Sequence, residues 1–231
     1  QAVVGSWASS LGGRTAPVLD VQTRTRFNEA NDSHYYLVPG VIVTIMTMIG
    51  ALLTSLVMAR EYERGTLESL FVTPVGSGEI LTAKAATNFL LGMVSLAISM
   101  IFAAFVFGIP IRGSLLLLLA VSALFLIVAL GLGLVISTAT KNQFLACQFA
   151  IMGTFMPALM LSGFLYDILN MPPAVRAATY IIPARYYVTL LQTLFLAGDI
   201  PSVIIPCCIT LGVFAVVLMG IARMKAPKSL E

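Results

Sequence analysis

The stretch from Arg60 to Lys84 reads REYERGTLESLFVTPVGSGEILTAK and gathers four acidic and three basic residues. Long apolar runs flank it on both sides, and each exceeds the roughly 18 residues that a bilayer-crossing helix requires. The whole chain is 59% hydrophobic and only 10% charged, which is typical of integral membrane proteins. The sequence therefore predicts a charged loop between two membrane spans.

Five apolar runs have the length of a transmembrane helix, about 20 to 25 residues each. A soluble helical core would instead need polar residues at helical spacing, and the run from Leu115 to Val135 contains almost none. We therefore predict an all-α integral membrane protein. The predicted spans are Tyr36–Ala59, Ala85–Ile109, Leu115–Thr138, Phe144–Tyr166 and Val203–Ala222.

Lys and Arg residues near the span ends are divided unevenly, with seven on one side of the membrane and three on the other. Positive charge is retained on the cytoplasmic side. We therefore expect the C-terminus and the Arg60–Lys84 loop to be cytoplasmic and the N-terminus to lie outside. The seven are Arg60, Arg64, Lys84, Lys141, Arg223, Lys225 and Lys228, and the three are Arg112, Arg176 and Arg185.

Residues 1–34 precede the first predicted span and contain no apolar signal core. Between Val18 and Phe27, apolar residues or Thr alternate with Gln and Arg, which is the period-two pattern of a β-strand. A lone strand needs sheet partners to be stable. We therefore interpret residues 1–34 as the remnant of a larger extracytoplasmic domain, and residues 35–231 as the transmembrane domain.

The five predicted spans contain no Asp, Glu, Lys, Arg or His. Ion-coupled carriers usually place such groups inside the membrane to bind or relay the driving ion, so that class is disfavoured. The chain also lacks the phosphate-binding G-x-x-x-x-G-K-[ST] loop, and we assign the Gly131-x-Gly133 pair to helix packing. The single histidine, His34, offers no metal site, and we predict no catalytic residue. Energy for uphill transport would have to come from a partner.

The charged loop has the pattern of a short helix at the membrane surface. We expect Gly65 to interrupt the preceding helix, Thr66 to cap a new one and Pro74 to end it. This pattern leaves two interpretations open, a docking element for a partner or an ordinary solvated loop. The residues that would share one face and form an apolar knob are Leu67, Leu70 and Phe71.

A second short helix is predicted between Tyr166 and Val203, where several prolines interrupt the chain. The apolar run Tyr186–Ala197 has only twelve residues, which is too few to span a bilayer. It fits a re-entrant or interfacial helix on the outer side, with its ends at Pro183 and Gly198.

Three motifs occur together in the first half of the chain: LVPG at 37–40, AREYERGTLE at 59–68 and VTPV at 72–75. In this combination the chain resembles the permease subunits of the type 2 family of ABC transporters, specifically bacterial exporters related to multidrug efflux permeases. The similarity extends through the later spans to Lys225. Permeases of that family have six spans, so the resemblance implies that the five spans here are the second to the sixth.

The resemblance also implies functional residues at both ends of the spans. A coupling helix in the charged loop would contact a separate ATPase, and short re-entrant helices would narrow the outer exit, although an outer lid that merely packs is an open alternative. The coupling residues would be Arg60, Glu61, Glu63, Arg64, Gly65, Thr66, Leu67, Glu68, Leu70 and Phe71. The residues of the outer gate would be Pro183, Tyr186, Tyr187 and Leu190.

We therefore expect the membrane-spanning subunit of an ATP-driven exporter in a bacterial inner membrane, paired with a second permease as a homodimer or heterodimer. ATP and Mg would be bound by cytoplasmic ATPase subunits, and we expect no cofactor on this chain and no nucleic-acid partner. An ion-coupled secondary transporter and a non-transporting membrane scaffold or assembly factor are the alternatives. Methionines in the spans would suit a drug-like, lipid-like or other amphipathic substrate, and would equally suit ordinary packing. They include Met46, Met48, Met93, Met100, Met152, Met156 and Met160.

Overall fold

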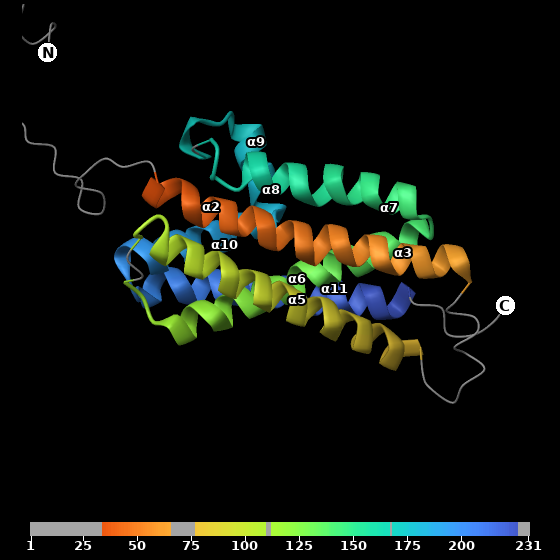
Figure 1. Ribbon diagram of the computed structural model, residues 1–231. Coiled ribbons are helices and arrows are strands. Elements are labelled where there is room, and N and C mark those ends of the chain that lie inside the picture. Colours follow the sequence, from red (N-terminus) through yellow and green to blue (C-terminus); the bar gives the residue numbers. More distant parts are fainter. Residues whose placement is uncertain (1–33, 66–76, 110–111, 167, 226–231) are drawn as a thin grey trace, which may run out of the picture. The chain divides into compact units, whose positions relative to one another are not determined.

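The computed structural model describes residues 34–65, 77–109, 112–166 and 168–225 (Figure 1). This part of the chain is built from helices and contains no β-strand. Five of its helices are long and apolar enough to cross a membrane, which confirms the prediction of an all-α integral membrane protein. These spans are Leu37–Arg64, Thr82–Phe105, Leu115–Thr140, Gln143–Leu161 and Pro201–Met224.

The first span is one continuous helix made of α2 (His34–Thr47), η1 (Met48–Leu53) and α3 (Thr54–Arg64). The segment η1 is π-helical, which the hydropathy pattern did not predict; such segments widen one turn of an α-helix. The helix ends where Gly65 adopts a left-handed conformation with φ 64°, so the predicted interruption at Gly65 is confirmed. The span continues past the predicted end at Ala59.

The later spans differ from the predicted ones at their ends. The second span stops at Phe105 and the fourth at Leu161, before the predicted ends at Ile109 and Tyr166. Shortly after the fourth span, Gly163 has φ 89°, a conformation that cannot continue a right-handed helix. The segments of these spans are α5 (Ser77–Phe105), α6 (Leu115–Thr140), α7 (Gln143–Ala150), π-helical η2 (Ile151–Phe155), α8 (Met156–Leu161) and α11 (Pro201–Lys225).

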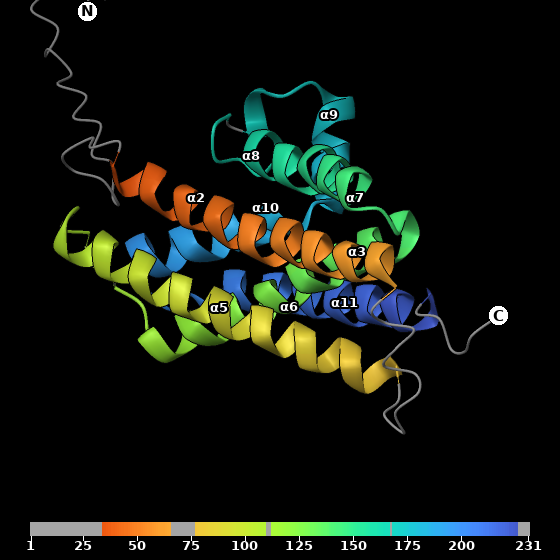
Figure 2. The same cartoon turned by 45° about the vertical axis from the view of Figure 1, so that its right-hand side comes forward.

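Residues 168–200, which we call the interspan segment, contain the predicted short helix. It begins at Pro183 and stops at Gly198, where φ is 89°, so both predicted ends are confirmed. The helix packs against α2, α6 and α11 (Figure 2). The segment consists of η3 (Ile168–Asn170), α9 (Pro173–Ala178), η4 (Thr179–Ile181), α10 (Pro183–Gln192) and π-helical η5 (Thr193–Ala197).

The third span, α6, is the centre of the bundle and contacts η1, α3, α5, α7, α10 and α11. Two glycines of α6 itself allow close approaches to its neighbours. A Cβ on Gly133 would lie 2.6 Å from the carbonyl oxygen of Ala51 in η1, and a Cβ on Gly131 would lie 3.0 Å from the Cβ of Leu218 in α11. Small residues let membrane helices pack closely in this way. The assignment of Gly131 and Gly133 to helix packing is confirmed.

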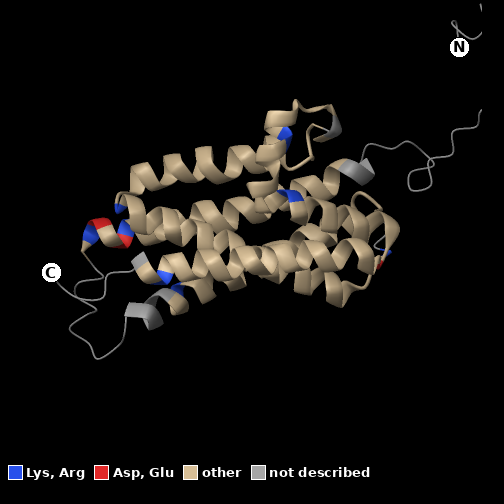
Figure 3. Ribbon diagram, turned by 180° about the vertical axis from the view of Figure 1, so that it is seen from behind, with Lys and Arg blue, Asp and Glu red and all other residues tan. Residues whose placement is uncertain are grey.

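The two ends of the bundle carry different sets of charged residues (Figure 3). At one end, which we call the Arg64 end, α3, α6 and α11 finish and α5 and α7 begin. At the other, the Asp199 end, α6 and α11 begin and the interspan segment finishes. Among the residues whose side chains the structure describes, the Arg64 end carries Arg60, Glu61, Glu63, Arg64, Lys84, Lys141 and Arg223, the Asp199 end carries Arg112 and Asp199, and the interspan segment carries Arg176 and Arg185.

Three sequence predictions concern residues that lie outside the described part of the chain. They are the strand Val18–Phe27, the rest of the extracytoplasmic remnant before His34, and the coupling helix within residues 66–76. These stay predictions.

The close approach of α6 to η1 gives a first test. Replacing a helical glycine with alanine ordinarily favours a helix by about 1 kcal/mol. We expect Gly133→Ala instead to destabilise the protein by about 1–3 kcal/mol, because its methyl group would press on backbone atoms of η1. The control is Gly212→Ala in α11, where an added Cβ meets nothing within 4 Å. Thermal unfolding in detergent would compare the two variants with the unmodified protein. A Gly133→Ala variant as stable as the unmodified protein, or more stable, would contradict the packing argument.

Candidate functional site

An ion pair joins the last turn of α3 to the start of α5 at the Arg64 end. Lys84 Nζ contacts Glu61 Oε1, and both side chains are partly exposed. Residues 65–76 connect the same two helices, so this pair links the two ends of the predicted coupling loop. An ion pair near water contributes about 0–1 kcal/mol to stability. Its main consequence is therefore the spacing of the loop ends.

The last turn of α3 also binds the start of α7. Glu63 Oε2 accepts a hydrogen bond from the backbone N–H of Gln143 over 3.1 Å, and Arg60 Nε donates to Gln143 Oε1 over 3.4 Å. Gln143 is the first residue of α7, and N–H groups in the first turn have no partner within the helix. The positive end of the helix dipole also favours a carboxylate there. The Asn142 side chain caps the same helix by accepting from the Leu145 N–H over 3.1 Å.

Half of the predicted coupling residues lie outside the described part of the chain, namely Thr66, Leu67, Glu68, Leu70 and Phe71. The family resemblance implies that the whole set forms a surface for a partner. The structure shows that Arg60, Glu61 and Glu63 contact α5 and α7 of their own chain. Arg64 is exposed, and Gly65 ends the helix. Contact of any of these residues with an ATPase stays a prediction.

At the Asp199 end, the interspan segment holds the turn that precedes α6. Asp199 Oδ1 accepts from the backbone N–H of Ser114, the N-cap residue of α6, over 2.9 Å. The N–H of Gly113 donates to the carbonyl oxygen of Leu194 in η5 over 2.8 Å. The end of the short helix is thereby attached to the start of the central span.

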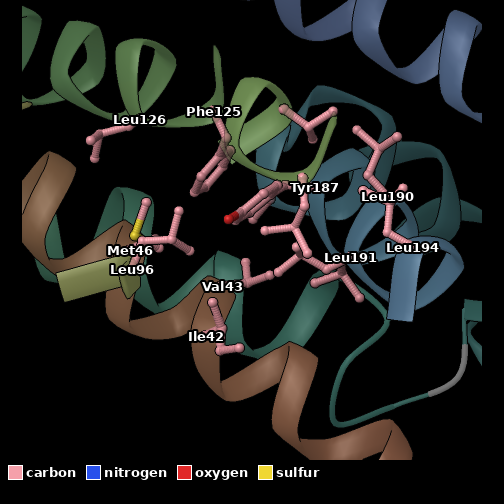
Figure 4. Close-up of a cluster of buried hydrophobic side chains, with 14 of the residues drawn as sticks. Ile42, Val43, Met46, Leu96, Phe125, Leu126, Tyr187, Leu190, Leu191 and Leu194 are labelled. Carbon is pink, nitrogen blue, oxygen red and sulfur yellow. The ribbon is translucent and has the colours of Figure 1, made fainter. Parts of the chain in front are cut away.

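Tyr187 lies in the core of the chain, between α10 and α6. Its ring stacks on that of Phe125, with centroids 4.1 Å apart and planes 13° apart (Figure 4). Its hydroxyl donates to Ser122 Oγ over 2.8 Å. Burial raises the pKa of the Tyr187 phenol far above its ordinary value, so the hydroxyl stays protonated and remains a donor.

The other gate candidates lie in different surroundings. Tyr186 donates its hydroxyl to a backbone carbonyl of η4 over 3.0 Å, and its ring lies 6.3 Å from that of Phe214 in α11. Leu190 is fully buried, as Tyr187 is. Pro183 begins α10 and lines a cavity. The gate role of these residues stays a prediction, but within this chain two of the four are core residues.

A cavity of about 370 Å³ lies between α2, α6, η2, α8 and the segment from α9 to α10. Two polar side chains line it, Thr47 and Thr154, and both donate their hydroxyls to carbonyl oxygens of their own helices, over 2.8 Å and 2.5 Å. The walls are therefore apolar, as is common in sites for organic ligands. The lining residues are Thr47, Phe125, Ala129, Leu132, Gly153, Thr154, Pro157, Ala158, Leu161, Ala178, Ile181, Ile182, Pro183 and Ala184.

The methionines that the sequence analysis connected with a substrate do not line this cavity. Met46 is fully buried in the core, whereas Met152, Met156 and Met160 are exposed on the surface of the chain. Apolar composition alone could not separate these environments.

Several residues that hold the site together were missed by the sequence analysis. Gln143 and Phe125 could not be recognised from the sequence, since a polar residue at the start of a helix and an apolar residue inside a span are both common. Two polar residues inside apolar spans did give a signal: Ser122 bonds Tyr187, and Asn88 Nδ2 donates to Thr54 Oγ1 over 3.1 Å, joining α5 to α3. Interhelical bonds of this kind are typical of membrane proteins.

Comparison with known proteins identifies related chains. Residues 10–196 match the family described as ABC-2 type transporter. The chain is 47% identical to "Probable multidrug ABC transporter permease YbhS" of Escherichia coli (strain K12) over 97% of its own length and 59% of that protein. It is 31% identical to "Probable multidrug ABC transporter permease YbhR" of the same organism over 77% of its length and 48% of that protein. It is 27% identical to "Inner membrane transport permease YhhJ", also of this strain, over 98% of its length and 61% of that protein. The chain thus spans about half to three fifths of these relatives.

The buried Tyr187 hydroxyl gives a second test. We expect Tyr187→Phe to destabilise the protein by about 1 kcal/mol, because the stack on Phe125 is kept while the bond to Ser122 is lost. Tyr186→Phe is the control, since it also removes a hydroxyl from α10 but at an exposed hydrogen bond, and should change stability by less than about 0.5 kcal/mol. Thermal unfolding in detergent measures both. If the two variants lost the same stability, Tyr187 would not have the structural role assigned to it.

Proposed function

The chain belongs to the ABC-2 type transporter family, and from this membership we propose that it is the membrane-spanning subunit of an ATP-driven exporter. Hydrolysis would take place in a separate cytoplasmic subunit, which would bind ATP and Mg²⁺. The observation that supports this most directly is the Arg64 end. There the loop of residues 65–76 joins two spans whose ends are linked by the Glu61–Lys84 ion pair, so a force on the loop would reach both spans.

The proposed orientation places the Arg64 end in the cytoplasm of a bacterium, with the spans in the inner membrane. Among the residues whose side chains the structure describes, five basic residues at this end support it, against three at the Asp199 end and in the interspan segment, since positive charge is retained on the cytoplasmic side. One of the related proteins is named an inner membrane transport permease. The basic residues are Arg60, Arg64, Lys84, Lys141 and Arg223 at one end and Arg112, Arg176 and Arg185 at the other.

The proposed substrate is a drug-like, lipid-like or other amphipathic molecule. The cavity of about 370 Å³ supports this class, because its walls are apolar and its two threonine hydroxyls are already hydrogen-bonded within their helices. Two related proteins are named multidrug permeases. We also propose that a second permease, either a copy or a paralogue, completes the transport path. Apolar side chains that this chain leaves exposed on α5, α7 and α11 would face that partner or lipid.

The proposed orientation is tested by labelling single cysteines in a variant that lacks the three native ones. Arg64→Cys and Ala174→Cys are a matched pair, because both positions are exposed, one in the last turn of α3 and the other in α9 of the interspan segment. We expect a membrane-impermeant maleimide to label Arg64→Cys only from the cytoplasmic side and Ala174→Cys only from the outside. The reverse pattern would show that the orientation is wrong.

The proposed ATPase partner is tested by co-purification of the complete permease with ABC ATPase subunits. Replacing an aromatic anchor at an interface typically costs 2 kcal/mol or more, so we expect Phe71→Ala to weaken this association about thirtyfold. Phe105→Ala, at an exposed phenylalanine near the other end, is the control and should leave it unchanged. A permease that never binds an ABC ATPase would favour a carrier or scaffold function instead.

A further inference from the structure

The last turn of α3 holds two acidic residues with separate partners. Glu61 pairs with Lys84 and so connects the two helices that flank the 65–76 loop. Glu63 instead reaches α7, which begins 80 positions later in the sequence. The two acids, which the sequence pattern placed together in one docking surface, therefore serve two different connections.

The hydrogen bond between Glu63 and Gln143 can transmit movement from the end of α3 to the start of α7. It uses a backbone N–H at the start of α7 that has no acceptor within its own helix. A carboxylate at this position is favoured by both the hydrogen bond and the helix dipole. Arg60 Nε adds a second contact by donating to the side-chain amide oxygen of Gln143. The start of α7 is thus fixed to the end of α3 at two points.

The helix that starts at Gln143 forms a wall of the cavity. It continues from α7 through η2 into α8, and the cavity is lined by Gly153 and Thr154 of η2 and by Pro157 and Ala158 of α8. The opposite wall belongs to α6, where Phe125 is held by its stack on Tyr187. A shift at the start of α7 would therefore move one wall of the cavity against a fixed one.

We propose that Glu63 is a positioning residue that transmits movement of the end of α3 to α7, and through α7 to the cavity wall at η2. This inference rests on the proposed function, since an ATPase must move the end of α3. It assigns Glu63 a role within its own chain and does not require contact between Glu63 and the ATPase. Its counterpart on α7 is the backbone N–H of Gln143.

The proposal can be tested from both sides of the bond. Glu63→Ala removes the acceptor of this hydrogen bond. Glu63→Gln keeps an acceptor oxygen and should preserve much of the transmission from α3 to α7. Gln143→Pro removes both the N–H and the side-chain amide. Proline is well tolerated at the first position of a helix, and Asn142 before it is extended with φ −134° and ψ 131°, as a following proline requires. Leu115→Pro is the matched control, because it places proline at the same position of α6, after an extended Ser114.

The readout is the cavity wall itself. Gly153→Cys introduces a reporter at a lining position where an added Cβ meets nothing within 4 Å. In the complete transporter with its ATPase in nanodiscs, a small maleimide would label this cysteine with and without ATP and vanadate. We expect the nucleotide to change the labelling rate about fivefold or more, in keeping with the free energies that typically couple distant sites. Association with the ATPase is measured in parallel by co-purification.

We expect Glu63→Ala and Gln143→Pro each to abolish the nucleotide-dependent change, and the double variant to lose nothing more. Both should bind the ATPase as the unmodified protein does, and Leu115→Pro should respond normally. Weakened ATPase binding in Glu63→Ala alone would overturn the proposal in favour of direct docking. A normal response in Gln143→Pro, or no response in the unmodified transporter, would overturn it as well. A permease that binds no ATPase would instead refute the proposed function on which the inference rests.

Discussion

The close contact between α6 and the α2–η1–α3 helix is the constraint on which the rest of the bundle depends. In a membrane, burial of apolar surface does not drive helices together, because lipid is as apolar as the side chains. Association then depends on close packing. Gly133 permits the backbone of η1 to approach within contact distance, and Gly131 does the same for α11 on another face of α6. Side chains of any size at these two positions would separate the central helix from both neighbours.

Acidic side chains from neighbouring elements bind the starts of two spans. Asp199 accepts the N–H of Ser114 before α6 at one end of the bundle, and Glu63 accepts the N–H of Gln143 at the start of α7 at the other. In both cases a carboxylate satisfies a group that its own helix cannot satisfy. These charge-assisted bonds lie at the ends of the spans, where the cost of holding a charge is lower than inside the membrane. They fix how the ends of the helices meet without placing a charge in the middle of a span.

The existence of the five spans could be predicted, because hydropathy depends on composition within a single segment. The limits of the short helix at Pro183 and Gly198 could be predicted for the same reason, since proline and glycine act locally on the backbone. The π-helical segments could not, because η1 and η2 belong to longer helices whose apolar pattern they do not interrupt. Prediction of the site from local sequence fails at Glu63 for a similar reason. Its sequence context indicates an exposed charge, whereas its partner Gln143 is close only in the folded chain.

The walls of the cavity differ in how firmly the rest of the chain packs against them. On the α6 side, Phe125 is part of the Tyr187 stack, so this wall is continuous with the packed core and with the interspan segment. On the other side, η2 and α8 have more exposed side chains, among them Met152, Met156 and Met160. Movement at little cost is expected where few buried contacts oppose it. The wall formed by η2 and α8 is therefore the one that we expect to move, and its helix begins at the residue that Glu63 holds.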